Sequence, residues 1–254
     1  ETRPDAPFVI QQDGRALCYA EVDADANRFA NILLSHGIEA GDRVALLANN
    51  SPFYVVAYYG ILKAGGVAVP LNTAAAADTL AHYLRNTAAR FLAVGARLER
   101  NAAGALAAVA TAGCLKTIVA ERPKALANSM PQNVSVGTGT GTGVGVGAAL
   151  LDYAGVLAEA RSDRPPAHRI DVDVASIVHT SGSTGLPRGA TLTHRNLLAN
   201  TASIVEYLAL TSADRALAVL PFYYVYGKTL LNTHAAVGGS IVIENRTVYP
   251  TLVL

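Results

Sequence analysis

Short apolar runs alternate with segments of helical periodicity along most of this 254-residue chain. Strands are predicted at 43–48, 67–71, 90–94, 117–120, 175–180, 215–220 and 240–244. Helices are predicted at 19–36, from Pro52 to Gly65-Gly66, and at 78–86, 102–112, 148–160, 193–208 and 226–237. Strands that alternate with helices of this length are typical of parallel sheets. We therefore predict an α/β fold with parallel sheets flanked by helices.

Composition excludes several classes of protein. The 20 Lys+Arg against 19 Asp+Glu leave a net charge of +1, which argues against binding nucleic acid through a basic surface. Charged residues make up 15% and hydrophobic ones 51%, so the chain is not predominantly disordered. The longest apolar stretches, such as 53–62, are about half of the roughly 20 residues that a membrane span needs. No secretory signal opens the chain, and Cys18 and Cys114 match no metal or redox spacing, so we expect a cytoplasmic protein.

A glycine-rich stretch at 133–147 interrupts the alternation. It contains no Lys or Arg and follows no clear strand, so we interpret it as a flexible surface connection rather than a phosphate loop. A proline-marked linker follows at 161–169. We predict a first α/β subdomain with the N-terminal elements at 1–170. The phosphate loop and the start of a second α/β subdomain are predicted at 171–254.

The segment TSGSTGLPRG at 180–189 is the strongest candidate for a binding site. Glycine lets a backbone turn approach a ligand closely, and the exposed N–H groups of such a turn bind anions. Hydroxyl groups and an arginine add further donors to phosphate oxygens. The segment matches neither the Walker A pattern nor G-x-G-x-x-G, and a plain surface turn remains the alternative.

Four motifs, in order, resemble the adenylate-forming (acyl-activating) superfamily. They are ALCYAEVDADANRFANILLSHGIEAGDRVALLANNSP, GILKAGGVAVPLN, HTSGSTGLPRGATLTHRNL, and LPFYYVYG followed by GGSIVI. Together they cover nearly the whole chain, which is most similar to the N-terminal portion of acyl- and aryl-CoA ligases.

The resemblance implies two half-reactions. A carboxylic acid and ATP form acyl-AMP and pyrophosphate, usually with Mg²⁺, and a thiol of CoA or of a carrier protein then accepts the acyl group. It also implies that the ATP phosphates are bound by Thr180, Ser181, Gly182, Ser183, Thr184 and Gly185. Arg188 takes the position of the family's lysine, and we assign it a catalytic role that keeps the charge but changes its geometry.

The aromatic motif provides candidates for the acyl-substrate site. These are Tyr223, Tyr224, Tyr226 and Gly227, and Tyr224 stands where the family often has histidine. Packing against the sheet is the alternative role for the tyrosines. His179, His194 and His234 are interpreted as structural, Lys63 as a helix-end charge, and Lys228 as a residue on the surface or at a pocket rim.

The family's later motifs have no counterpart here, among them the metal-associated Glu, the ribose-binding Asp and the C-terminal catalytic Lys. We therefore expect Mg²⁺ to be held mainly by residues outside this chain, with no metal ligand inside it, and the fragment alone to be inactive. Two other functions stay open: an amino-acid adenylation domain of a peptide synthetase, and a non-catalytic truncated interaction module. Apolar surface near 240–244 and at 250–254 predicts self-association.

Overall fold

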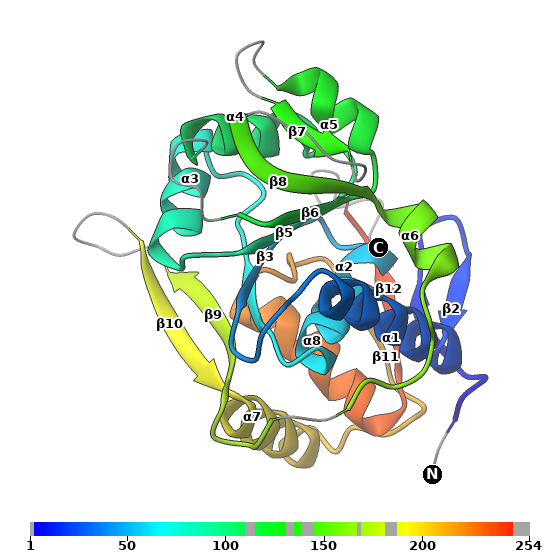
Figure 1. Cartoon of the computed structure of the whole chain (residues 1–254). Helices are drawn as coiled ribbons and strands as arrows, with labels where there is room; N and C mark the ends of the chain where they lie inside the picture. The colour runs from blue at the N-terminus through cyan, green and yellow to red at the C-terminus, as the bar shows by residue number, and fades with distance from the viewer. Residues whose placement is uncertain are drawn as a thin grey trace.

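The computed structural model describes residues 3–109, 115–130, 135–138, 145–166, 169–180 and 187–245. Its larger sheet has eight strands in the order β10-β9-β4-β3-β5-β6-β8-β7 (Figure 1). Their bounds are β3 Arg43–Leu47, β4 Val67–Pro70, β5 Phe91–Val94, β6 Thr117–Ala120, β7 Ser135–Thr138, β8 Gly145–Asp152, β9 Val174–Thr180 and β10 Arg188–Thr193. The smaller sheet has the order β11-β12-β1-β2, from β1 Pro7–Ile10, β2 Ala16–Cys18, β11 Arg215–Ala218 and β12 Ser240–Ile243.

Eight helices in the described residues cover these sheets. They are α1 Tyr19–Ser35, α2 Pro52–Lys63, α3 Ala77–Asn86, α4 Glu99–Val109, α5 Pro123–Ser129, α6 Tyr153–Glu159, α7 His194–Tyr207 and α8 Val225–Val237. The predicted start of α2 is confirmed, because the Ser51 side chain accepts a hydrogen bond from the Tyr54 amide and Pro52 is the first helical residue.

The eight-stranded sheet buries both faces. Val44 and Leu46 of β3 pack in the cluster that holds α1 and α2, whereas Ala45 and Leu47 pack in the cluster that holds α3, α4 and α5. Neighbouring residues of one strand point to opposite faces, so such a strand must be apolar throughout. Ile241 of the smaller sheet joins the first cluster. Helices α1 and α2 therefore lie in the layer between the two sheets (Figure 1).

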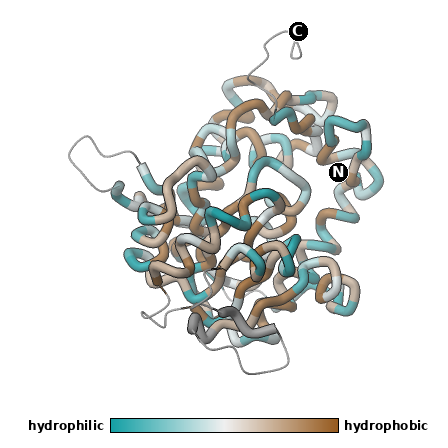
Figure 2. Tube along the Cα trace, turned by 90° about the horizontal axis from the view of Figure 1, so that it is seen from above, coloured by the Kyte–Doolittle hydropathy of each residue, from teal (hydrophilic) through white to brown (hydrophobic). Residues whose placement is uncertain are grey.

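The tube coloured by hydropathy agrees with this arrangement. Hydrophobic segments run through the middle of the molecule, and many of the hydrophilic segments lie at turns on its periphery (Figure 2). Within the described residues, no helix combines the length and the apolar character needed to cross a bilayer.

The predicted α/β fold is confirmed, with one addition. Most neighbouring strands are parallel, but β10 pairs antiparallel with β9 and β2 pairs antiparallel with β1. The sequence analysis predicted none of β1, β2, β10 and α5. Both sheets combine strands from before and after residue 170, and the division into two subdomains at that position stays a prediction.

Two predictions in the middle of the chain are wrong. The segment 148–160 is not one helix, because β8 continues to Asp152 and α6 begins only at Tyr153. Part of the stretch 133–147 is also regular, since β7 pairs in parallel with β8, which itself pairs with β6. Thr and Val between the glycines favour extended backbone, and the backbone of β6 supplies hydrogen-bond partners. The rest of that stretch lies outside the described residues.

The surface predicted to be exposed near 240–244 is buried. Strand β12 lies between β11 and β1, and Ile241 and Ile243 have exposed fractions of 0% and 3%. An inner strand of a sheet is covered on both edges, and that is why the prediction fails. The other predicted surface, 250–254, lies outside the described residues.

Candidate active site

The candidate phosphate loop joins the paired ends of β9 and β10. Thr180 and Arg188 are register partners in this antiparallel pair, and the Thr180 hydroxyl donates to the Arg188 carbonyl at 3.4 Å. Both side chains are exposed, and Arg188 forms no ion pair with a described residue. Ser181, Gly182, Ser183, Thr184 and Gly185 lie outside the described residues. The hairpin thus places Thr180 and Arg188 at paired positions, and Arg188 has no ion pair within the described part of the chain.

Strand β9 is anchored deep in the sheet. Ala175, Ser176 and Val178 are buried, and the Ser176 hydroxyl donates to the Ala68 carbonyl of β4 at 2.9 Å. A buried hydroxyl needs such a partner, because an unmet polar group in the interior is costly. The anchor fixes where β9 ends, and therefore where the candidate loop begins.

The aromatic motif forms the start of α8. Tyr224 is the N-cap residue, and its amide donates to the Pro221 carbonyl at 3.1 Å. A Cβ atom on Gly227 would lie 2.3 Å from the Pro221 carbonyl oxygen, so only glycine lets the first turn close on this loop. Tyr223 is buried and its ring lies 4.5 Å from the Tyr224 ring, centroid to centroid. Tyr224 and Tyr226 are exposed by 50% and 66%.

Tyr83 of α3 connects the two candidate segments. Its ring centroid lies 3.9 Å from that of His179, the residue before Thr180. Burial raises the pKa of Tyr83, and the neighbouring Tyr224 adds to that rise. Burial likewise raises the pKa of Tyr223 to about 12, again with a contribution from Tyr224. Tyr83 and Tyr223 therefore stay neutral near pH 7, and they link the end of β9 to the start of α8.

The three histidines have surroundings that fit structural roles. Burial lowers the pKa of His179 to about 4, with a smaller effect of His82, so its imidazole is neutral near pH 7. Burial also lowers the pKa of His194, whose amide donates to the Asp173 carbonyl. The Nδ1 atom of His234 lies 2.9 Å from the Leu230 carbonyl oxygen, one turn earlier in α8.

Sequence reasoning missed the residue that positions the aromatic motif. The side-chain Nδ2 of Asn50 donates to the Leu220 carbonyl at 3.0 Å. Its side-chain Oδ1 accepts from the Phe222 backbone amide at 2.7 Å. The Tyr54 hydroxyl donates to the Phe222 carbonyl at 2.9 Å. Asn50 stands just before the Ser51-Pro52 helix start, and this was the only local signal. Its role depends on a loop about 170 residues later in the chain.

Of the two alternatives for Lys228, the surface position is wrong, whereas the pocket-rim position agrees with its place among the residues that line a cavity. Its side chain is not on the surface, because only 2% of the residue is exposed. The amine donates to the Ser176 hydroxyl of β9 at 3.0 Å. Burial lowers the pKa of Lys228 to about 7. The sequence around position 228 gave no sign that β9 would cover this lysine.

Comparison with known proteins identifies the family. The family model described as AMP-binding enzyme matches residues 1–253. The chain belongs to this family. This confirms the resemblance of its four motifs to adenylate-forming enzymes, and it accounts for their order along the chain.

Relatives in this AMP-binding family include CoA ligases. The chain is 28% identical to a long-chain-fatty-acid–CoA ligase of Bacillus subtilis over 87% of its length, and 30% identical to a feruloyl-CoA synthase of Amycolatopsis over 96%. It matches ATP-bound MatB from Rhodopseudomonas palustris with a TM-score of 0.72 and 26% identity, covering 94% of this chain and 42% of that one. The chain spans 40–42% of the length of these two curated relatives.

Proposed function

We propose that this chain is part of an ATP-dependent acid–thiol ligase. In the first half-reaction, a carboxylate oxygen attacks the α-phosphorus of ATP, the bond to the bridging oxygen breaks, and pyrophosphate leaves. In the second, a thiol of CoA or of a carrier protein attacks the acyl carbonyl, and AMP leaves. Family membership and the CoA-ligase relatives support this proposal, as does an ATP-bound structural relative.

The observation that carries the proposal is that the paired ends of β9 and β10 lie beside the aromatic motif. Thr180 and Arg188 face each other there, and His179 leads through Tyr83 to Tyr224. We assign the β- and γ-phosphates to Thr180 and to residues 181–185. Arg188 stabilises the charge that develops on pyrophosphate, because a preorganised donor does this better than water. Its guanidinium is free of competing carboxylates in the described part of the chain.

The acid substrate is assigned to the start of α8. Tyr224 and Tyr226 have exposed rings, and the buried Tyr223 ring packs against that of Tyr224. Gly227 lets the first turn of the helix close on the preceding loop. Exposed aromatic rings supply a large apolar contact area for an acyl group. Tyr224 stands where the family often has histidine, and we assign it the role of orienting the acid.

Residues for Mg²⁺ cannot be assigned in this part of the protein. The described residues contain no group of three or more His, Cys, Asp or Glu side chains able to hold a metal ion. Arg188 and the hydroxyls provide the charge stabilisation that this chain itself can offer.

Replacing Arg188 by alanine tests the proposal. In the complete protein, we expect the substitution to slow acid-dependent exchange of pyrophosphate into ATP. The transition state should lose roughly 2–4 kcal/mol of stabilisation, the scale of one lost donor to a developing anion. Arg188→Lys should recover part of the rate, because it restores the charge without the bidentate geometry. Arg161, exposed and paired with Asp163, is the matched control, and Arg161→Ala should leave the rate unchanged. Equal rates for wild type and Arg188→Ala would remove Arg188 from the reaction.

We further propose that these 254 residues do not complete the reaction alone. Groups that act as a unit lose most of their effect when one is missing. The resemblance assigns a metal-associated Glu and a catalytic Lys to motifs that this sequence lacks. Purified chain should form no acyl-adenylate above a heat-inactivated control. Formation of acyl-adenylate in that assay would contradict the proposal.

A further inference from the structure

A cavity of about 210 Å³ opens between α7 and α8, next to the aromatic motif. Its lining residues come from the end of β10 and from both helices: Leu192, Asn196, Leu197, Asn200, Val225, Lys228, Thr229 and Asn232. Val225 is the first residue of α8 and directly follows Tyr224, so the cavity lies next to the proposed acyl site. Its volume suits a small organic group.

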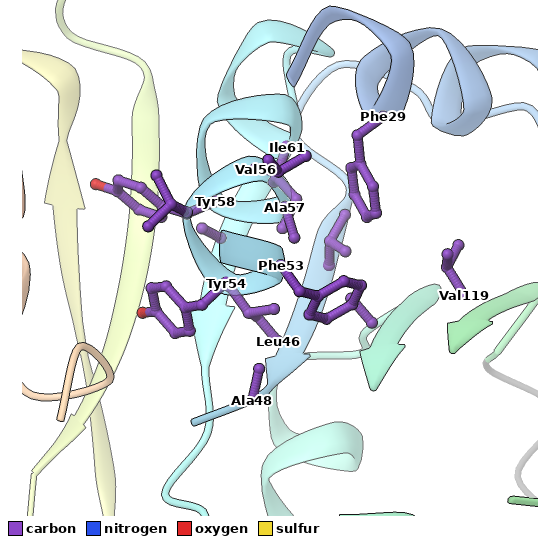
Figure 3. Packing of buried hydrophobic residues seen from close by; sticks show 14 of the residues in the cluster. Phe29, Leu46, Ala48, Phe53, Tyr54, Val56, Ala57, Tyr58, Ile61 and Val119 are labelled. Atoms are coloured by element: carbon purple, nitrogen blue, oxygen red, sulfur yellow. The ribbon is translucent and has the colours of Figure 1, made fainter. Parts of the chain in front are cut away.

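Lys228 contributes to the cavity wall, and its amine lies in the interior. The Nζ atom lies 3.0 Å from the Ser176 hydroxyl and 5.8 Å from the centroid of the Tyr58 ring. Tyr58 extends from α2 toward β9 (Figure 3). No carboxylate among the described residues lies within ion-pair distance of the amine. A buried cation without an anionic partner is among the costliest features of a protein interior.

Among the described residues, the Ser176 hydroxyl is the only hydrogen-bond acceptor recorded for the Lys228 amine. An ammonium group has three donors, and the Ser176 hydroxyl already donates to Ala68 while it accepts from Lys228. The buried Tyr58 hydroxyl has no partner at ordinary hydrogen-bond geometry among the described residues, but the Asn232 side chain lies close enough to offset part of the rise in its pKa that burial causes. The Asn232 side-chain oxygen already accepts from the Tyr59 hydroxyl at 3.3 Å. An apolar side chain would pack at position 228 without this cost, so a ligand that supplies an acceptor explains the lysine.

We propose that Lys228 determines the specificity of the acyl site, and that it selects carboxylic acids bearing a second hydrogen-bond acceptor far from the reacting carboxylate. Such acids are dicarboxylates and hydroxyaryl acids. The inference rests on the proposed function, because it places the acyl group in the cavity beside Tyr224. The flexible four-carbon stem lets the amine turn from Ser176 toward the bound acceptor. The lowered pKa of Lys228 fits an amine that regains its proton when a carboxylate arrives.

An acid without the second acceptor leaves the amine unsatisfied. A site built to hydrogen-bond a substrate group discriminates strongly against the analogue that lacks it, whereas a purely apolar pocket discriminates weakly. Wild-type protein should therefore favour hexanedioate over hexanoate, and 4-hydroxybenzoate over benzoate, by at least about tenfold in kcat/KM.

The decisive variant is Lys228→Met, which keeps the length of the side chain and removes the amine. In the complete protein, acid-dependent pyrophosphate release should lose the preference within each acid pair, mainly through a higher KM for the acceptor-bearing acid. Lys228→Gln keeps a donor and should retain part of the preference, which controls for misfolding. Lys124 is exposed on α5, against the opposite face of the large sheet, and Lys124→Met should behave as wild type.

Two outcomes would overturn the inference. One is activity in which wild type and Lys228→Met rank the paired acids identically. The other is a wild-type preference for hexanoate and benzoate. If no acid supports pyrophosphate release at all, the proposed function itself fails. Calorimetric titration of the 254-residue chain with hexanoate and hexanedioate then tests the specificity role of Lys228 separately. Tighter binding of hexanedioate that Lys228→Met abolishes supports the specificity role, and equal affinities overturn it.

Discussion

At the scale of single residues, burial decides which charges this protein keeps. Arg188 is exposed and free of ion pairs in the described structure, so it can meet a phosphate without first breaking another contact. Lys228 is enclosed, and its proton is therefore held weakly. His179 shows the same effect, because burial beside Tyr83 keeps its ring neutral. The same residue types on the surface would keep their ordinary charges.

Lys228 predicts a dependence of stability on pH. Its pKa falls from the ordinary 10.5 to about 7 on folding. Between these values the unfolded chain binds more protons than the folded one, so the free energy of unfolding rises with pH. Below about pH 7 both states are protonated, and this contribution becomes constant. Relative to Lys228→Met, wild type should gain about 2 kcal/mol between pH 7 and pH 9.

Urea unfolding of both proteins at pH 7, 8 and 9 provides the measurement. Taking the difference between them cancels the titration of all other groups, including the buried tyrosines. Parallel stability curves would show that the amine is solvated in the native state.

At the scale of elements, the site depends on how α8 begins. The Asn50 amide and the Tyr54 hydroxyl hold the loop before α8 through its backbone, and the helix then closes directly on Pro221. Tyr54 comes from α2, in the layer between the sheets (Figure 3). A helix start held from two directions keeps Tyr223 and Tyr224 in place without a ligand.

Gly227→Ala should disrupt this helix start. The added methyl would lie 2.3 Å from the Pro221 carbonyl oxygen and 3.0 Å from that of Leu220, and both contacts are with backbone. Overpacking of this kind typically costs about 1–3 kcal/mol, so the urea midpoint should fall. Gly155 in α6 is a matched control, because a methyl there meets only the Asp152 side chain, at 3.4 Å. Gly155→Ala should be neutral or slightly stabilising, and a similar loss in both variants would contradict this account.

At the scale of the whole molecule, exposed apolar side chains gather on α7, α8 and β11. Leu198, Leu217 and Tyr226 are exposed by 66%, 40% and 66%. Among the described strands, β11 is also one of the two outer strands of the smaller sheet. Apolar surface and an unpaired strand edge both favour association with another chain.

The 254-residue chain should therefore self-associate as its concentration rises. Light scattering after size exclusion should show a mass above 26.3 kDa that falls in a Leu198→Glu, Leu217→Glu double variant. Leu34 is an exposed leucine on α1, and Leu34→Glu should not change the mass. A monomer at every concentration would remove this prediction.

The sequence determined those elements whose pattern is local. Apolar runs such as 43–47 and 91–94 predicted buried strands, because a strand covered on both faces must be apolar throughout. Ser51-Pro52 predicted a helix start, which the structure confirms. The phosphate loop that the Gly and hydroxyl residues after β9 indicate stays a prediction. Tertiary structure decided the rest. Strand β8 begins in a glycine-rich segment because β6 offers a backbone to pair with, and β7 pairs in turn with β8. Lys228 is buried because β9 and α2 cover it, and Asn50 holds a loop that is distant in sequence. Burial and hydrogen bonding between distant segments are set by the fold, and no local pattern encodes them.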